Sequence, residues 1–212
     1  MHGNEAAPEE LFEQGLAALH LDLSAEVQQK FMDYIALMLK WNRVYNLTSV
    51  RKPALMVTRH LLDSLVVLQH IKEPRLLDVG SGAGLPGIPL ALARPDWQIV
   101  LLDGNAKKTR FMTQAVADLG LQNVKVVHER VELFKPEQPF DTIISRAFST
   151  VENMTEMAGG LLAPEGRLLA MKGVYPLAEL EMLPDGFTVK EVIKLDVPTL
   201  DADRHLVWIE RV

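Results

Sequence analysis

Residues 76–87 read LLDVGSGAGLPG, which is a short apolar run followed by a turn with glycine at positions 80, 82, 84 and 87. Glycine at alternate positions lets the backbone adopt positive φ and approach a ligand closely. In an open α/β sheet, ligands bind beyond the carboxyl ends of the strands, at the point where the strand order reverses. The segment therefore predicts a buried strand, a turn that holds a nucleotide-type cofactor, and the start of a helix.

The pattern continues on the C-terminal side of this turn as short apolar strands that alternate with helical stretches. Strands are expected at 76–79, 99–102, 124–127, 140–145 and 167–171, and helices at 85–94, 106–119 and 150–162. Such alternation predicts a parallel sheet with right-handed crossovers and helices on both faces. Two β-rich runs near 187–197 and 205–210, separated by a polar loop, predict an antiparallel hairpin at the sheet edge. The fold class is α/β and Rossmann-like.

The residues before this region are predicted to be helical. Apolar side chains recur every three or four positions after Ser24, which is a candidate N-cap, and a second helix is expected to begin with Pro53 in its first turn. We divide the chain into a helical extension, residues 1–73, packed on a Rossmann-like domain, residues 74–212. The two parts are expected to form one structural unit.

Composition restricts the class of protein. The chain has 212 residues, enough for one large domain, and contains no cysteine. Disulfides, thiolate metal sites and a cysteine nucleophile are therefore excluded, and the composition suits a reducing compartment. The acidic N-terminus does not resemble a secretory signal, and no apolar run reaches the ~20 residues that a membrane span requires. We expect a cytoplasmic protein.

The charge is unevenly distributed. The formal net charge of −6 argues against binding to nucleic acid, because neutralising phosphates requires an excess of lysine and arginine. Residues 40–63, however, contain five basic side chains and only one acid, Asp63. This segment is either a solvated helical face or a surface that binds RNA.

Two acids beside the glycine turn bear on the identity of the cofactor. Asp78 would repel a pyrophosphate but suits the amino and sulfonium groups of S-adenosylmethionine. Asp103 ends the next strand, where a carboxylate can accept hydrogen bonds from both ribose hydroxyls. The spacing Gly82-x-Gly84-x-x-Gly87 also fits a dinucleotide site, so Asp78 is the residue that favours the methyl donor over NAD.

Several long motifs resemble those of one family. They are WNRVYNLTSV at 41–50, RHLLDS at 59–64, DVGSGAGLPGIPL at 78–90, ISRAF at 144–148 and LDADRHL at 200–206. This chain resembles the RsmG family, also called glucose-inhibited division protein B, over nearly its whole length after about residue 24. The resemblance implies a class I S-adenosylmethionine-dependent methyltransferase that modifies N7 of one guanine in 16S ribosomal RNA. Ala83 and Gly104 depart from the usual family pattern without putting the cofactor in doubt.

The resemblance also implies cofactor contacts. Matching positions are Gly80 and Leu85 in the turn, Val131 and Glu132 after the third strand, and Arg146 after the fourth. Gly82 and Asp103 join this set by the reasoning above. Glu132 is alternatively an exposed helix-capping acid. Arg146 either pairs with the carboxylate of the donor's methionine moiety or reads the edge of a guanine, and the first role is favoured.

Methylation of guanine N7 requires no general base, because this nitrogen carries an in-plane lone pair and no proton. No catalytic residue beyond positioning groups is therefore expected. Phe148 either stacks on an extruded base or faces the core. His60 and His205 lack the spacing of metal ligands, and no metal is expected.

The residues expected to contact RNA are basic and are predicted to lie at the same edge of the sheet as the cofactor turn. They are Arg43, Arg51, Lys52, Lys107 and Lys108. The acidic total favours an assembled small ribosomal subunit over naked RNA as the partner, and the protein is expected to be a monomer. The alternatives are a methyltransferase of small molecules, an NAD-dependent dehydrogenase and a non-catalytic RNA-binding module.

Overall fold

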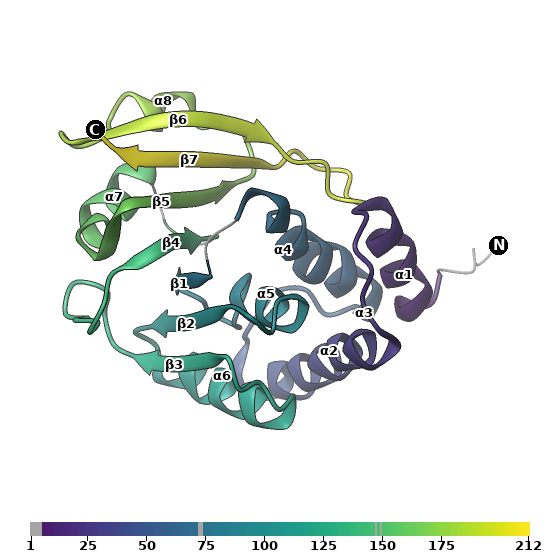
Figure 1. Ribbon diagram of the computed structural model, residues 1–212. Helices are drawn as coiled ribbons and strands as arrows, with labels where there is room; N and C mark the ends of the chain where they lie inside the picture. The colour runs from purple at the N-terminus through teal and green to yellow at the C-terminus, as the bar shows by residue number, and fades with distance from the viewer. Residues whose placement is uncertain (1–5, 72–73, 147, 149) are drawn as a thin grey trace.

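The computed structural model describes residues 6–71, 74–146, 148 and 150–212. One seven-stranded sheet with the order β3-β2-β1-β4-β5-β7-β6 runs through the molecule (Figure 1). Strands β1 to β5 are parallel, whereas β7 is antiparallel to both β5 and β6. The predicted fold class, a mostly parallel sheet with an antiparallel C-terminal hairpin, is confirmed.

The strands follow the sequence prediction closely. Their bounds are β1 Arg75–Val79, β2 Gln98–Asp103, β3 Val124–His128, β4 Phe140–Ser145, β5 Leu162–Lys172, β6 Phe187–Lys194 and β7 His205–Arg211. The largest difference is β5, which begins at Leu162, a position expected to lie in the preceding helix. That helix ends at Ala158, and a 3-10 turn, η3 (Gly159–Leu161), leads into the strand.

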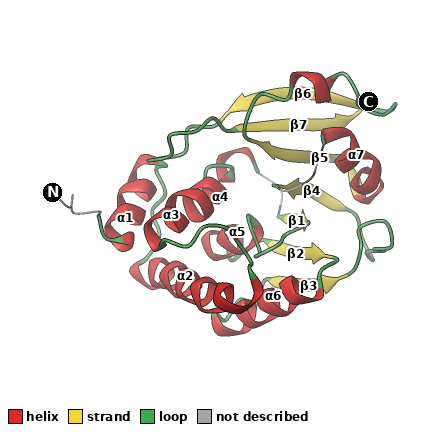
Figure 2. Cartoon of the chain, turned by 180° about the vertical axis from the view of Figure 1, so that it is seen from behind, coloured by secondary structure: helices red, strands yellow, loops and turns green. Residues whose placement is uncertain are grey.

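Helices cover both faces of the sheet (Figure 2). Helices α5 (Gly87–Ala93) and α6 (Ala106–Asp118) pack on one face, and α7 (Val151–Ala158) packs on the other. Two hydrophobic cores result, the first on the α5 and α6 face of the sheet and the second on the α7 face. Successive side chains of β1 alternate between them, because Leu76 belongs to the first core and Leu77 to the second. A further short helix, α8 (Leu177–Leu180), was not predicted.

The N-terminal helices extend the first of these cores. They are α1 (Pro8–Ala18) and α2 (Ala25–Tyr45), and the Ser24 side chain accepts a hydrogen bond from the Val27 amide, as its predicted N-cap role requires. Buried Phe31 and Tyr34 of α2 share a core with residues of α5 and α6. The hydrophobic core is therefore continuous from the N-terminal helices into the sheet layer.

The helix expected from Pro53 is a run of shorter elements. It comprises α3 (Pro53–Met56), a π-helical turn η1 (Val57–Leu62), α4 (Asp63–Leu65) and a 3-10 turn η2 (Leu68–His70). The start at Pro53 is confirmed, but a single uninterrupted α-helix was wrong. The domain boundary predicted after residue 73 adjoins residues 72–73, which lie outside the described residues, and it stays a prediction.

Candidate active site

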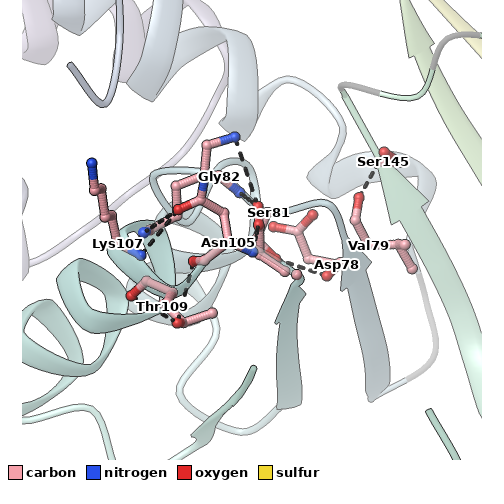
Figure 3. A network of polar contacts seen from close by, with 12 residues as sticks. Asp78, Val79, Ser81, Gly82, Asn105, Lys107, Thr109 and Ser145 are labelled. Atoms are coloured by element: carbon pink, nitrogen blue, oxygen red, sulfur yellow. Dashed lines mark hydrogen bonds and ion pairs between the residues drawn. The ribbon is translucent and has the colours of Figure 1, made fainter. Parts of the chain in front are cut away.

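The glycine turn after β1 adopts backbone conformations that residues with a side chain rarely adopt. Gly80, Gly82 and Gly84 have φ values of +69°, +62° and +83°. The amides of Gly80 and Ser81 both donate to the carbonyl oxygen of Leu102 on β2, at 2.8 and 3.2 Å. The Ser81 hydroxyl donates to the Asp78 carbonyl at 2.7 Å (Figure 3). The turn is thus held to β2 by its backbone amides and to β1 by the Ser81 hydroxyl.

Asp78, in β1, holds the far end of this turn in place. Its side chain is completely buried, and Oδ2 accepts a hydrogen bond from the Gly87 amide at 2.9 Å. Burial raises the pKa of Asp78 to about 7, although the Gly87 hydrogen bond acts in the opposite direction. Oδ2 thus fixes the start of α5, whereas Oδ1 has no hydrogen-bond partner among the described residues, and the interpretation of Asp78 as a contact for the donor's cationic groups stays a prediction.

Asp103 connects the ends of two strands. One carboxylate oxygen accepts from the Gly82 amide at 2.9 Å, and the other accepts from the Asn105 amide at 2.8 Å. Asn105 in turn caps α6, because its side chain accepts from the amides of Lys107 and Lys108 (Figure 3). The carboxylate keeps further lone pairs for a ligand, since each oxygen can accept more than one hydrogen bond.

A cavity of about 240 Å³ opens beside this carboxylate. Four residues predicted to contact the cofactor line it together, namely Gly80, Asp103, Val131 and Glu132, and Phe148 joins them. We call this hollow the donor cavity. A Cβ atom placed on Gly80 would meet no atom of the described residues within 4 Å, so the turn faces open space there.

Three other predicted cofactor residues have different positions. Gly82 donates its amide to Asp103 and thereby shapes the turn. Leu85 is almost fully buried in the first core, and its amide donates to Ser81 within the turn. Arg146 lines a different cavity, described next. The structure thus gathers four of the seven predicted residues around one hollow.

Arg146 is held by a buried carboxylate from the N-terminal region. It donates to Asp63 Oδ2 at 3.2 Å and to the carbonyl oxygen of Arg59 at 3.0 Å. Arg204, just before β7, donates to the other oxygen of Asp63 at 2.7 Å. Asp63 is only 2% exposed, so one buried carboxylate joins two arginines from distant parts of the chain. The Arg146 guanidinium is therefore fixed in position and only partly exposed.

These residues line a cavity of about 470 Å³ at the carboxyl ends of β4 and β5, which we call the arginine cavity. His60 also lines it, and its Nδ1 donates to the Arg59 carbonyl while its Nε2 faces the Thr48 hydroxyl at 2.9 Å. Burial, together with the nearby Arg146 cation, lowers the pKa of His60 to about 4. The imidazole is therefore neutral near pH 7, and its Nε2 accepts a hydrogen bond from the Thr48 hydroxyl.

The basic segment that begins at residue 40 is ordered by Asn42. The Asn42 side chain donates to the Thr48 carbonyl and accepts from the Thr48 amide, at 2.9 and 3.0 Å. Arg43 and Arg51 line a shallow hollow beside it. The ring of Trp41 contacts Phe111 of α6 edge-on, at 5.6 Å, so the end of α2 lies against the helix that carries Lys107 and Lys108. The predicted RNA contacts Arg43, Lys107 and Lys108 therefore belong to adjacent helices, whereas Arg51 and Lys52 lie in the segment between α2 and α3.

Lys108 has an additional position near the donor cavity. Its ammonium group lies 3.9 Å from Asp103 Oδ2.

Phe148 has two surroundings, because it packs against the second core and also lines the donor cavity. Neither placement separates the alternatives that the sequence left open for Phe148.

Sequence reasoning gave no role to Asp63, Arg204 or Tyr34. Tyr34 donates its hydroxyl to the carbonyl oxygen of Ala83, which ties α2 to the glycine turn. Asp63 and Arg204 are 141 positions apart, so no local pattern reveals their contact. The usable signal was that each sits inside a motif quoted for the family resemblance, RHLLDS and LDADRHL.

Comparisons with known proteins agree with this geometry. Residues 27–207 match the model of the GidB family, described as rRNA small subunit methyltransferase G. The chain belongs to this family. It is 52% identical to ribosomal RNA small subunit methyltransferase G of Chromobacterium violaceum, covering 92% of this chain and 93% of that one. The corresponding protein of Laribacter hongkongensis is 53% identical over 91% of this chain and 93% of its own length.

Solved structures show the same fold at much lower identity. A SAM-dependent methyltransferase from Aquifex aeolicus has a TM-score of 0.57 at 22% identity and covers 72% of this chain and 91% of that one. Another from Thiobacillus denitrificans, in complex with S-adenosyl-L-homocysteine, has a TM-score of 0.53 at 14% identity, covering 71% and 90%. Family membership and fold confirm the predicted class, an S-adenosylmethionine-dependent methyltransferase.

Within the described part of the chain, no group of three or more histidine, aspartate or glutamate side chains is placed to hold a metal ion. His60 and His205 instead bond to protein oxygens. Over the same residues, every helix is too short or too polar to cross a membrane.

Proposed function

We propose that this protein transfers a methyl group from S-adenosylmethionine to N7 of a guanine in 16S ribosomal RNA. The observation that carries the proposal is membership in the family described as rRNA small subunit methyltransferase G, over residues 27–207. The relatives from Chromobacterium violaceum and Laribacter hongkongensis bear the same name. This membership favours the rRNA substrate over a small molecule and the methyl donor over NAD.

The donor cavity fits the adenosine part of the cofactor. The open space at Gly80 admits a ligand close to the backbone, and Asp103 supplies an acceptor for ribose hydroxyls. Val131 and Glu132 would lie along the adenine, while Gly82 and Leu85 keep the turn in shape. When bound, the cofactor supplies an electrophilic methyl group.

Arg146 would then face the boundary between cofactor and substrate. It leaves the carboxyl end of β4, next to β1, and lines the arginine cavity. From there its guanidinium can pair with the cofactor's carboxylate, which is the role we favour, or donate to guanine O6. Asp63 holds the guanidinium in either role.

The reaction needs alignment more than proton transfer. Guanine N7 attacks with its own lone pair, so the protein has to hold this nitrogen in line with the methyl group and exclude water. The chain contains no cysteine, and a covalent cysteine intermediate is excluded. The residues around the two cavities would thus act by binding and orienting.

We assign RNA binding to Arg43, Arg51, Lys52, Lys107 and Lys108. Arg43 on α2 and the two lysines on α6 belong to neighbouring helices, and Arg51 and Lys52 lie in the segment between α2 and α3. Because the whole chain has a formal charge of −6, we expect it to recognise a preassembled small subunit rather than naked RNA. We further propose a cytoplasmic monomer, with residues 1–73 as a helical extension of the catalytic domain, residues 74–212.

The direct test is methylation of ribosomes. Small subunits from cells lacking this gene would be incubated with labelled S-adenosylmethionine and the protein, and 7-methylguanine would be mapped by chemical cleavage. We expect label at one guanine of 16S RNA. Label at another base, or none, would refute the proposal. Labelling of protein-free transcript as fast as that of assembled subunits would refute the preassembled subunit as the partner.

A second test concerns the RNA contacts alone. Reversing the charge of Arg51 and Lys52 to glutamate should weaken binding to the subunit in a salt-dependent way, because counterion release scales with the number of neutralised phosphates. Affinity for S-adenosylhomocysteine should stay the same, since neither residue lines the donor cavity. An unchanged methylation rate on small subunits would remove both residues from the RNA surface.

A further inference from the structure

The arginine cavity has the charge expected of a site for an anion. Among the described residues that line it, Arg59, Arg146, Lys172 and Arg204 are cationic and Asp63 is the only acid. Asp63 pairs with two of the arginines, and Lys172 pairs with Glu179, which lies outside the lining, at 2.8 Å. His60 is neutral near pH 7. A positive excess therefore remains at this cavity in a protein whose net charge is −6.

An ordered segment leads from the cavity to an exposed aromatic ring. Asp63 fixes Arg204, and the next residue, His205, donates from Nδ1 to the carbonyl oxygen of Gly173 at 2.9 Å. The ring of His205 meets the ring of Tyr175 edge-on, with centroids 5.6 Å apart. Gly173 lines the cavity, so Tyr175 lies two residues beyond its wall.

Tyr175 is held in place and yet half exposed. Its exposed fraction is 51%, and its neighbours Val174 and Leu177 are 79% and 66% exposed. These three apolar side chains are therefore accessible to a ligand, and none of them belongs to either hydrophobic core. Proteins that bind single-stranded nucleic acid combine such aromatic rings with a cationic groove, because a base stacks on the ring while the groove holds the phosphates.

We infer that Tyr175 is a stacking platform for an unpaired base of the RNA substrate, next to the nucleotide that enters the arginine cavity. The inference rests on the proposed function and names a contact outside the predicted RNA-binding set. The occupant is RNA rather than protein, because the apolar rim adjoins a cavity with a positive excess. A protein partner would instead use Val174, Tyr175 and Leu177 as one apolar patch.

The test compares substitutions in this loop. Tyr175→Ala should raise KM for small ribosomal subunits about tenfold, since removal of one stacking side chain weakens binding by roughly 1–3 kcal/mol per base, and leave kcat within about twofold. Tyr175→Phe and Tyr175→Trp should restore KM, because both keep an aromatic face. Leu177→Ala is the matched control, since it shortens an exposed apolar side chain two positions further along, at the start of α8, and it should leave KM unchanged.

Two further measurements keep the result unambiguous. Affinity for S-adenosylhomocysteine should equal that of the wild type, because the ring does not line the donor cavity. The melting temperature of Tyr175→Ala should fall by no more than about 3 °C, because the ring belongs to neither core and loses only its contact with His205. The inference is overturned if Tyr175→Ala leaves KM unchanged, if Phe fails to rescue, or if Leu177→Ala raises KM equally. Absence of guanine methylation by the wild type would instead defeat the proposed function itself.

Discussion

The donor cavity and the arginine cavity lie at the same edge of the sheet but are held together in different ways. Around the donor cavity, Gly82, Asp103 and Asn105 are joined mostly through backbone amides, between positions at most 21 apart. Around the arginine cavity, side chains of residues 83 and 141 positions apart meet on Asp63. The first site is therefore a property of local backbone, and the second depends on the folded chain as a whole.

The largest expected effect lies on the arginine side. Asp63→Ala leaves two partly buried guanidinium groups without their carboxylate, and loss of one partner from a buried pair costs about 3 kcal/mol of unfolding free energy. Urea denaturation measures the loss. Asp203→Ala is the control, because its ion pair with Lys194 is exposed and should contribute less than about 1 kcal/mol. Equal losses in both variants would show that Asp63 does not hold this cavity together.

On the donor side the corresponding probe is steric. A Cβ atom on Gly87 would lie 2.2 Å from a methyl group of Leu101 and 2.9 Å from Asp78 Oδ2. Overpacking of this kind typically costs 1–3 kcal/mol, so Gly87→Ala should lower the unfolding free energy by about 2 kcal/mol. Gly160→Ala is the control, since its Cβ would meet nothing described within 4 Å. If both alanines are tolerated equally, the turn is looser than its contacts indicate.

A smaller effect is expected for the polar link between turn and strand. Asp103→Asn keeps the shape of the side chain but turns an amide NH₂ toward the backbone donor of Gly82 or Asn105. We expect affinity for S-adenosylhomocysteine to fall about tenfold, or about 1.4 kcal/mol, in calorimetric titration. Asp118→Asn, at the far end of α6, is the matched control. Unchanged affinity would place the ribose elsewhere.

The smallest effect depends on pH. The pKa of His60 is lowered to about 4 by burial and Arg146, so the unfolded chain binds the proton first as pH falls below about 6.5. Stability contributed by neutral His60 is complete above this value and is lost toward pH 4. Asp78, with its raised pKa, acts oppositely in the same range.

Comparison with His60→Gln at each pH isolates the histidine, because Asp78 is present in both proteins. The glutamine side chain is uncharged and can still accept from Thr48. Between pH 6.5 and 5.5 the wild type should lose about 1 kcal/mol more unfolding free energy than the variant. Parallel pH curves from urea denaturation would mean that the imidazole is not protected from protonation.

The same contrast explains what the sequence could predict. The strands and the glycine turn were placed correctly because alternating apolar runs and glycine spacing are local signals. The hydrogen bond by which Asp78 fixes the start of α5 was not predicted, because a sequence shows the residue type at a strand end but not which way its carboxyl group points. The joint role of Asp63 and Arg204 was missed because their contact closes a loop of 141 positions, and the break in the helix after Pro53 leaves no mark in residue type.

The π-helical turn η1 fixes the direction in which Asp63, the next residue, points from the helix axis. A π turn contains one residue more than the matching α-helical turn, and each residue advances a helix by about 100°. Loss of a single residue from Val57–Leu62 would let the segment close as an ordinary helix, yet would swing Asp63 roughly a quarter-turn away from both guanidinium groups. The number of residues in η1 is thus as important for the two ion pairs as the carboxylate of Asp63 itself.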